Sequence, residues 1–129
     1  KCRENDQLKP TVLILKYGKG GHNTLQQDLY GDVFFPIQTL LFLNQPDEDY
    51  TGGEFVLTQQ TPRAQSKAIV LKPNKGDMLV FTTNFRPIKG SKGYYRVNMK
   101  HGVSEIRRLN LPVSRVVVVC LGRSFPEPI

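Results

Sequence analysis

The chain has 129 residues, 39% of them hydrophobic, which predicts a single domain, residues 1–129, with one packed core. Its formal charge of +7 arises from 18 Lys and Arg against 11 Asp and Glu, which favours an anionic partner such as nucleic acid. Two cysteines exclude a disulfide framework and a cysteine-rich zinc site, and no apolar run approaches the roughly 18 to 20 residues that span a membrane.

Cysteine usage and leader signals bear on where the protein works. A chain with so few cysteines fits a reducing compartment, so we expect an intracellular protein, cytoplasmic or nuclear. No basic-then-apolar leader is recognisable near the first residues. The chain begins abruptly with KCREND, which is also the pattern expected of a fragment of a longer protein.

Short apolar runs, rich in Val, Ile, Leu, Phe and Thr, recur along the chain between clusters of Gly, Pro, Asn and Asp. This pattern predicts β-strands, and no segment has the sustained 3.6-residue period of a helix, so at most one short helix is expected. Short strands at this spacing predict a mostly β fold, a sandwich or barrel, with the double-stranded β-helix (jelly roll) among the candidates. The expected strands are residues 11–17, 34–43, 54–59, 68–71, 78–82, 94–99 and 115–121.

The basic residues concentrate in the second half of the chain. Residues 1–54 contain eight acidic and five basic side chains, whereas residues 63–123 contain thirteen basic and two acidic ones. Such a bias is typical either of a solvated face or of a phosphate-binding rim, with Phe85 or Tyr94 available to stack on an extruded base. The candidate rim residues are Arg63, Lys67, Arg86, Lys89, Lys92 and Lys100.

Asp28 and His101 are candidate metal ligands. A non-haem iron(II) oxygenase holds its metal with two imidazoles and one carboxylate and leaves the remaining positions open. In jelly-roll oxygenases the carboxylate lies near a strand end and a second histidine comes from a later strand. Asp28 is followed by a long β region and then by His101, 73 residues further on, which suits that layout.

A family resemblance strengthens this interpretation. The segment LILKYGKGGHNTLQQD resembles, without gaps, part of the AlkB family of 2-oxoglutarate/iron(II) oxygenases. The blocks LQQDLYG, TGGEFVLT, KGDMLVF and YRVNMKHGVS are similar to those of a mostly bacterial oxygenase family thought to act on damaged nucleic acid. The resemblance implies a jelly roll with Fe(II) and 2-oxoglutarate as cofactors. It also implies that Asp28 and His101 hold iron and that Tyr17 binds the 2-oxoglutarate carboxylate.

One iron ligand of the family is missing. The position that is histidine in the family is Gln26, and a neutral amide oxygen is a poorer ligand for iron(II) than imidazole. His22 lies six residues before Asp28 instead of two, in a stretch that reads as a turn, so we expect a surface histidine there. Gln26 is therefore expected to be a weak third ligand or none. A natural loss and an engineered substitution would both give this pattern.

Further pocket residues are expected from the resemblance. An arginine on the strand after the distal histidine would bind the far carboxylate of 2-oxoglutarate through its planar fork, and Arg115 is the candidate. Arg107 and Arg108 are the alternatives for this role, although we expect them to be loop or phosphate contacts. Arg96 and Asn98 share one strand face by alternation and are candidate substrate contacts, together with Tyr30, and Glu54 could also face the pocket.

The sequence thus predicts a 2-oxoglutarate- and iron(II)-dependent oxygenase domain that demethylates alkylated nucleobases of DNA or RNA, with activity that depends on Gln26. A prolyl-hydroxylase-like protein oxygenase is one alternative, because the HGVS block is shared with those enzymes. A catalytically inactive, nucleic-acid-binding β-sandwich is another, and Gln26 favours it. The sequence indicates no oligomeric state.

Overall fold

The computed structural model describes residues 11–27 and 36–123, and within these ranges every regular element is a β-strand. No helix in this part of the chain is long and apolar enough to cross a lipid bilayer. The strands are β1 (Thr11–Tyr17), β2 (Asn23–Gln26), β3 (Ile37–Phe42), β4 (Tyr50–Gly52), β5 (Phe55–Gln60), β6 (Ser66–Leu71), β7 (Met78–Thr82), β8 (Phe85–Gly90), β9 (Gly93–Val103), β10 (Ile106–Leu109) and β11 (Val116–Arg123).

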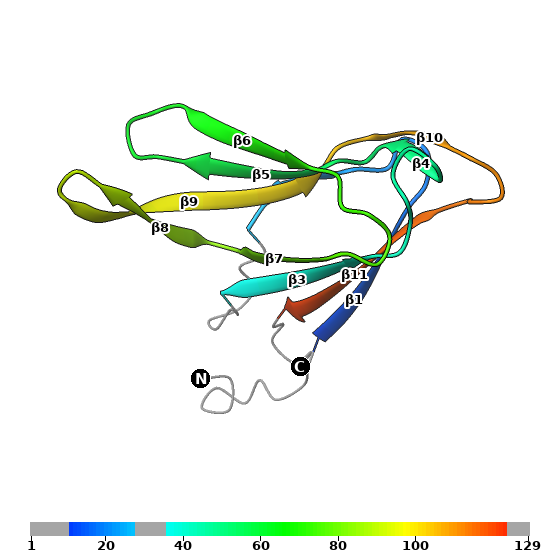
Figure 1. Ribbon diagram of the computed structural model, residues 1–129, viewed down its shortest axis with the longest axis horizontal. Coiled ribbons are helices and arrows are strands. Elements are labelled where there is room, and N and C mark those ends of the chain that lie inside the picture. Colours follow the sequence, from blue (N-terminus) through cyan, green and yellow to red (C-terminus); the bar gives the residue numbers. More distant parts are fainter. Residues whose placement is uncertain (1–10, 28–35, 124–129) are drawn as a thin grey trace, which may run out of the picture.

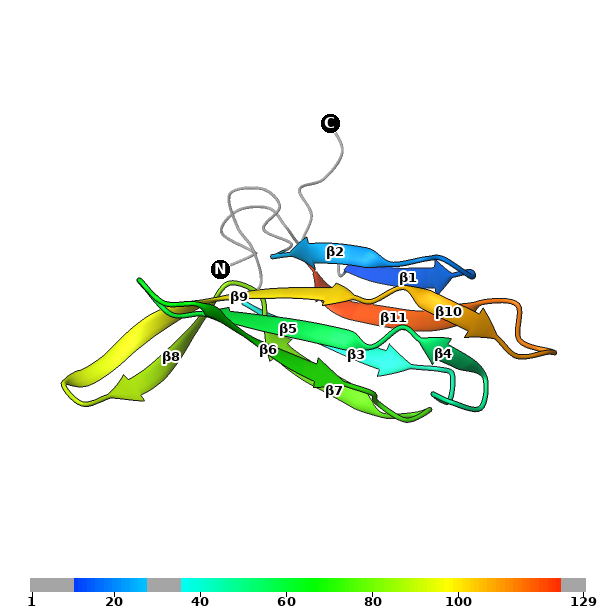
Figure 2. The same cartoon turned by 90° about the horizontal axis from the view of Figure 1, so that it is seen from above.

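Two antiparallel sheets face each other (Figure 1). One has the strand order β1-β11-β3-β7, and the other has the order β2-β9-β5-β6 with β8 added beside β9. A short β4–β10 ribbon lies at one end, and the β8–β9 hairpin projects at the other (Figure 2). Apart from the β5–β6 and β8–β9 hairpins, neighbours in each sheet come from distant parts of the sequence, as in a jelly roll, and the fold predicted from the sequence is confirmed.

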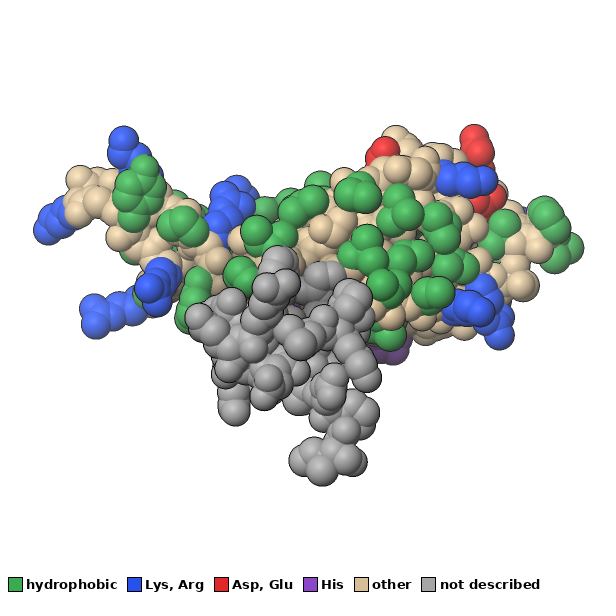
Figure 3. All heavy atoms as spheres, turned by 90° about the horizontal axis from the view of Figure 1, so that it is seen from below, with side chains coloured by type: hydrophobic (Ala, Val, Ile, Leu, Met, Phe, Trp, Pro, Cys, Tyr) green, Lys and Arg blue, Asp and Glu red, His purple; other side chains and the backbone are tan. Residues whose placement is uncertain are grey.

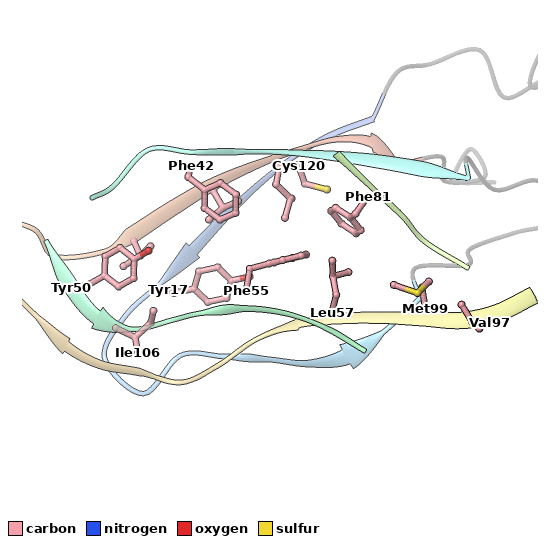
Figure 4. Packing of buried hydrophobic residues seen from close by; sticks show 13 residues of the cluster. Tyr17, Phe42, Tyr50, Phe55, Leu57, Phe81, Val97, Met99, Ile106 and Cys120 are labelled. Carbon is pink, nitrogen blue, oxygen red and sulfur yellow. The ribbon is translucent and has the colours of Figure 1, made fainter. Parts of the chain in front are cut away.

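The core fills the space between the two sheets. Phe55 is 1% exposed, and its ring contacts those of Phe42 and Phe81 at centroid distances of 6.4 and 5.1 Å. Figure 4 shows these rings pointing toward one another from opposite sheets. Aromatic pairs at these separations stabilise a core beyond the burial of their area. The ring cluster therefore joins the two facing sheets through β3, β5 and β7.

The sheet formed by β1, β11, β3 and β7 is apolar on its outer face as well. Val12, Ile14, Met78 and Val80 each expose more than half of their surface, and Figure 3 shows apolar side chains gathered over this sheet. Residues at alternate positions of the same strands point into the core. Because both faces are apolar, these strands appear in the sequence as continuous runs such as TVLIL and VVVVCL instead of alternating patterns.

All seven strands expected from the sequence are present, and four others were missed. Strand β1 has the predicted bounds, and β9 is longer than predicted because it continues through His101 to Val103. The strands that the sequence pattern did not predict are β2, β4, β8 and β10. These four are short or polar, and each depends on pairing with another strand instead of on a local apolar pattern: β2, β4 and β10 pair with distant segments, and β8 forms a hairpin with β9.

Candidate active site

Strand β9 brings His101 into the space between the sheets. Val97, Met99 and His101 alternate with exposed residues, so their side chains share the buried face of the strand. The imidazole stacks on Phe55 with 6.2 Å between ring centroids and lies at a tilt to Phe81 at 4.9 Å. The ring is thus fixed by packing, and its orientation is set before any ligand binds.

Strand β2 passes directly beside this histidine. In the β2–β9 register Gln26 is paired with His101, and Asn23 with Val103. Gly102 makes the close approach possible, because a Cβ at this position would lie only 2.8 Å from the Asn23 carbonyl oxygen. The HGV block therefore has a steric reason for its glycine, and the register sets residue 26 directly beside His101.

Tyr17 and Asn23 form a polar pair in the same region. The Asn23 Nδ2 group donates a hydrogen bond of 2.6 Å to the Tyr17 hydroxyl, and Tyr17 is buried at the end of β1. This bond joins the two sheets, because β1 and β2 belong to different ones. Tyr17 was predicted as a co-substrate contact and Asn23 was missed, because the GKGGHN stretch reads as a turn.

These residues surround a pocket of about 200 Å³, here called the His101 pocket. Besides Asn23, the polar side chain of Gln38 lines the pocket and was not expected there. Its buried position could have been predicted, because Gln38 lies two residues before Leu40 on a strand whose alternate positions are buried. The complete lining is Leu15, Tyr17, Asn23, Gln26, Gln38, Leu40, Phe42, Phe55, His101, Gly102, Val103, Val118 and Cys120.

The donors in the pocket are a partial fit for iron(II). His101 supplies one imidazole, and Gln26 opposite it supplies an amide oxygen, which is a weaker ligand. Asp28, the predicted carboxylate ligand, lies outside the described residues, as does Tyr30. Among residues 11–27 and 36–123 no three His, Cys, Asp or Glu side chains come together. The ligand assignments of Asp28 and Gln26 remain predictions.

Arg115 lies beside the pocket but does not line it. A Cβ on Gly18 would be 3.2 Å from its Nη1 atom, so the guanidinium crosses the Tyr17–Gly18 turn. Nη1 donates a hydrogen bond of 2.8 Å to the Ser114 carbonyl oxygen, and the side chain is exposed. The next residue, Val116, is the one that points inward. Contact of Arg115 with 2-oxoglutarate stays a prediction that requires the side chain to turn.

Arg96 and Asn98 do share a strand face, but it is the face opposite to His101. Arg96 and Asn98 lie an odd number of residues before His101 in the same strand. Alternation therefore directs their side chains out of the sandwich, where both are exposed. They line a shallow notch of about 340 Å³ together with Gln60, Pro62 and Phe85. The expectation that they line the pocket beside the histidine is therefore wrong.

Glu54 also points away from the pocket. Its carboxylate accepts a short hydrogen bond from the Ser104 hydroxyl and lies 3.5 Å from Arg107, and the Glu54 amide donates to Ser104 Oγ at 2.9 Å. The Ser104 hydrogen bond is the largest cause that lowers the pKa of Glu54 below its usual 4.5; burial opposes the shift, and a backbone hydrogen bond and the nearby cations add to it. This cluster ties the TGGEF block to the HGVS block. His22 is exposed in the turn, as expected.

Two uncharacterized proteins of Mycobacterium tuberculosis, MT2286 (strain CDC 1551 / Oshkosh) and Rv2227 (strain H37Rv), are each 45% identical to the chain over 106 residues. The match covers 82% of this chain and 46% of each relative, so the chain spans about half the length of these curated relatives.

Solved structures of two prolyl 4-hydroxylases have a similar fold. The enzyme of Pseudomonas putida has a TM-score of 0.54 at 17% identity, covering 87% of this chain and 51% of the other. The enzyme of Phytophthora capsici has a TM-score of 0.56 at 16% identity, covering 98% and 38%. Likeness at this identity shows the fold alone.

Residues 1–113 match a protein family described as "Oxygenase, catalysing oxidative methylation of damaged DNA". The matched range includes the pocket residues from Leu15 to Val103 and both halves of the β2–β9 pair. The chain therefore belongs to this family of oxygenases.

Proposed function

We propose that this chain is the jelly-roll core of a 2-oxoglutarate- and iron(II)-dependent oxygenase that acts on N-methylated nucleobases. The observation that carries the proposal is the register of β2 and β9, which sets residue 26 opposite the buried His101 at the wall of an apolar pocket. Family membership supports the reaction class, and the basic second half of the chain supports a nucleic-acid substrate.

The chain's own residues hold and orient the reactants. His101 and the predicted ligand Asp28 would hold the metal, and Gln26, which is paired with His101, would be the weak third ligand. Tyr17 and Asn23 offer a hydroxyl and an amide to a co-substrate carboxylate. When bound, iron(II) would supply the hydroxylation of a methyl group on a base nitrogen, with dioxygen as the oxidant and 2-oxoglutarate as the co-substrate. One oxygen atom would go to the methyl group and the other to 2-oxoglutarate, which would leave as succinate and carbon dioxide. The hydroxymethyl group would then leave as formaldehyde, and the base nitrogen would regain a proton.

The pocket itself limits what can enter. Most of its lining is apolar, and a low-dielectric wall strengthens the polar interactions inside the pocket. Its volume of about 200 Å³ is below the roughly 300 to 1,000 Å³ of typical ligand pockets. The described residues therefore suit a small co-substrate, and a target base would present only its methylated edge.

Gln26 favours a second candidate function. With an amide in place of imidazole the site holds iron(II) weakly, and a chain that does not load its metal would serve as a nucleic-acid-binding module. The two candidates differ in a single property, namely the consumption of 2-oxoglutarate.

The test is formaldehyde release from oligonucleotides that carry an N-methylated base, using the chain and its Gln26→His variant with iron(II) and 2-oxoglutarate. We expect the variant to release formaldehyde faster than the chain. Gln27→His is the matched control, because its side chain hydrogen-bonds to the Met99 carbonyl oxygen and is not paired with His101. An iron-loaded Gln26→His variant that leaves methylated oligonucleotides intact but hydroxylates proline peptides would overturn the substrate assignment.

A further inference from the structure

The β8–β9 hairpin carries a row of aromatic and cationic side chains on its outer side. In the antiparallel register Phe85 is paired with Asn98 and Lys89 with Tyr94, and Gln60 of β5 is paired with the same Asn98. Paired residues point to the same side of a sheet. The residues that share this side, here called the stacking face, are Gln60, Phe85, Lys89, Tyr94, Arg96, Asn98 and Lys100.

The stacking face is exposed and apolar in its centre. Tyr94 is 75% exposed and Phe85 is 46% exposed, which is unusual for large aromatic side chains. The Arg96 guanidinium lies over the Phe85 ring, 5.5 Å from its centroid. The two side chains form one wall of the notch that Gln60, Pro62 and Asn98 complete. The notch thus combines a flat stacking surface with two side-chain amides.

The charge around this face is of a single sign. Strands β5, β6, β8 and β9 with their hairpin loops, residues 55–71 and 85–103, contain seven Lys and Arg and no Asp or Glu. The ion pairs between described residues lie at the other end of the molecule, at Lys72–Asp47 and Arg107–Glu54. In Figure 3 Lys and Arg project from the hairpin end, and acidic side chains gather at the opposite end.

We propose that the stacking face binds a single strand of nucleic acid outside the His101 pocket. Unpaired bases stack on Phe85 and Tyr94, the notch amides contact base edges, and Lys89, Arg96 and Lys100 contact phosphates. Aromatic platforms combined with cations are the chemistry by which single strands are bound without strict sequence preference. A paired duplex hides its base faces, so it gains the phosphate contacts only.

The spacing of the two aromatic side chains fits this partner. Phe85 is paired with Asn98, which lies four residues beyond Tyr94 on β9, so the two aromatic side chains are separated by about 14 Å at about 3.4 Å per residue. A strand that contacts both rings therefore extends over several nucleotides. The stacking face and His101 lie on opposite sides of β9. The stacking face therefore holds the nucleic-acid strand and does not take part in the oxidation.

The inference rests on the proposed function for the choice of a nucleic-acid ligand, but its test requires neither iron nor 2-oxoglutarate. Binding of fluorescein-labelled oligo(dT), oligo(rU) and a DNA duplex of equal length is measured by anisotropy at several KCl concentrations. We expect the single strands to bind more tightly than the duplex. Tyr94→Ala and Phe85→Ala should each weaken single-strand binding roughly tenfold, the loss of one stacked base.

Three further variants test whether binding depends on the stacking face itself or only on the general charge and stability of the protein. Tyr95→Ala removes an aromatic ring from the same strand on the opposite side, where it packs over Gly90, and should leave affinity unchanged. The double variant Lys89→Ala/Arg96→Ala should lose two phosphate contacts. The slope of its plot of log affinity against log salt concentration should therefore be shallower by about 1.4, at about 0.7 per contact. The Phe85→Tyr variant should bind the single strands with the same affinity as the unchanged chain.

The outcomes that overturn the inference are equally specific. It fails if the duplex binds as tightly as the single strands, or if Tyr95→Ala and Tyr94→Ala weaken binding equally. It also fails if no oligonucleotide binds. A chain that binds single strands through this face, yet whose Gln26→His variant neither binds 2-oxoglutarate nor releases formaldehyde, would support this inference and contradict the proposed function.

Discussion

Gly102 determines how closely β2 can approach His101. The Gly102→Ala substitution should therefore displace the backbone of β2 next to the histidine. The added Cβ would lie 2.8 Å from the Asn23 carbonyl oxygen, 3.2 Å from the Thr24 carbonyl carbon and 3.3 Å from the Leu25 nitrogen. All three are backbone atoms, so β2 must move by a few tenths of an ångström as a unit. Overpacking of this kind costs about 1 to 3 kcal/mol.

Thermal and urea unfolding of Gly102→Ala measure this cost. For a chain of 129 residues about 1 kcal/mol corresponds to about 4 °C, so a fall of about 4 to 12 °C in the midpoint is expected. Lys100→Ala is the control, because it changes an exposed residue of the same strand and should stay within about 0.5 kcal/mol. If Gly102→Ala unfolds at the same temperature as the unchanged chain, β2 does not lie where the register places it.

Three further changes test the packing and polar contacts of the site. Phe55→Ala removes the ring on which His101 stacks and should lower the free energy of unfolding by about 3 to 5 kcal/mol in urea titrations. Ser104→Ala should cost about 1.5 kcal/mol at neutral pH. Since the pKa of Glu54 is lowered in the folded state, that cost should shrink as the pH falls below 4.5, and a pH-independent cost would contradict it. Tyr17→Phe should cost about 1 kcal/mol by leaving its amide partner without an acceptor.

The sequence predicted the fold class, but only some of its strands. Apolar runs such as the one in β1 were recognised because they are locally complete. Strand β8 was missed because FRPIKG contains Pro87, yet β8 pairs only with β9 along the described chain, and an edge strand tolerates proline. Strand β2 is four residues long and becomes a strand through its pairing with β9, which no local pattern contains.

The place of a residue in the pocket could be predicted where its neighbours in sequence determined its surroundings, whereas its role as iron ligand or co-substrate contact stays a prediction. His101 and Tyr17 were expected at a pocket, and both line it. Asn23 was missed because its role depends on the hydrogen bond between the two sheets. Arg96 and Asn98 were misplaced although their odd separation from His101 already indicated the opposite face of the strand.

The central claim is that the His101 pocket is an oxygenase site weakened at one ligand, and anaerobic titration with iron(II) and 2-oxoglutarate tests it most directly. The chain, Gln26→His and the control Gln27→His are compared by calorimetry in the absence of oxygen. We expect Gln26→His to bind both ligands more tightly than the chain, and Gln27→His to behave as the chain does. If Gln26→His binds neither ligand, the pocket is not a 2-oxoglutarate and iron site, and the account is contradicted.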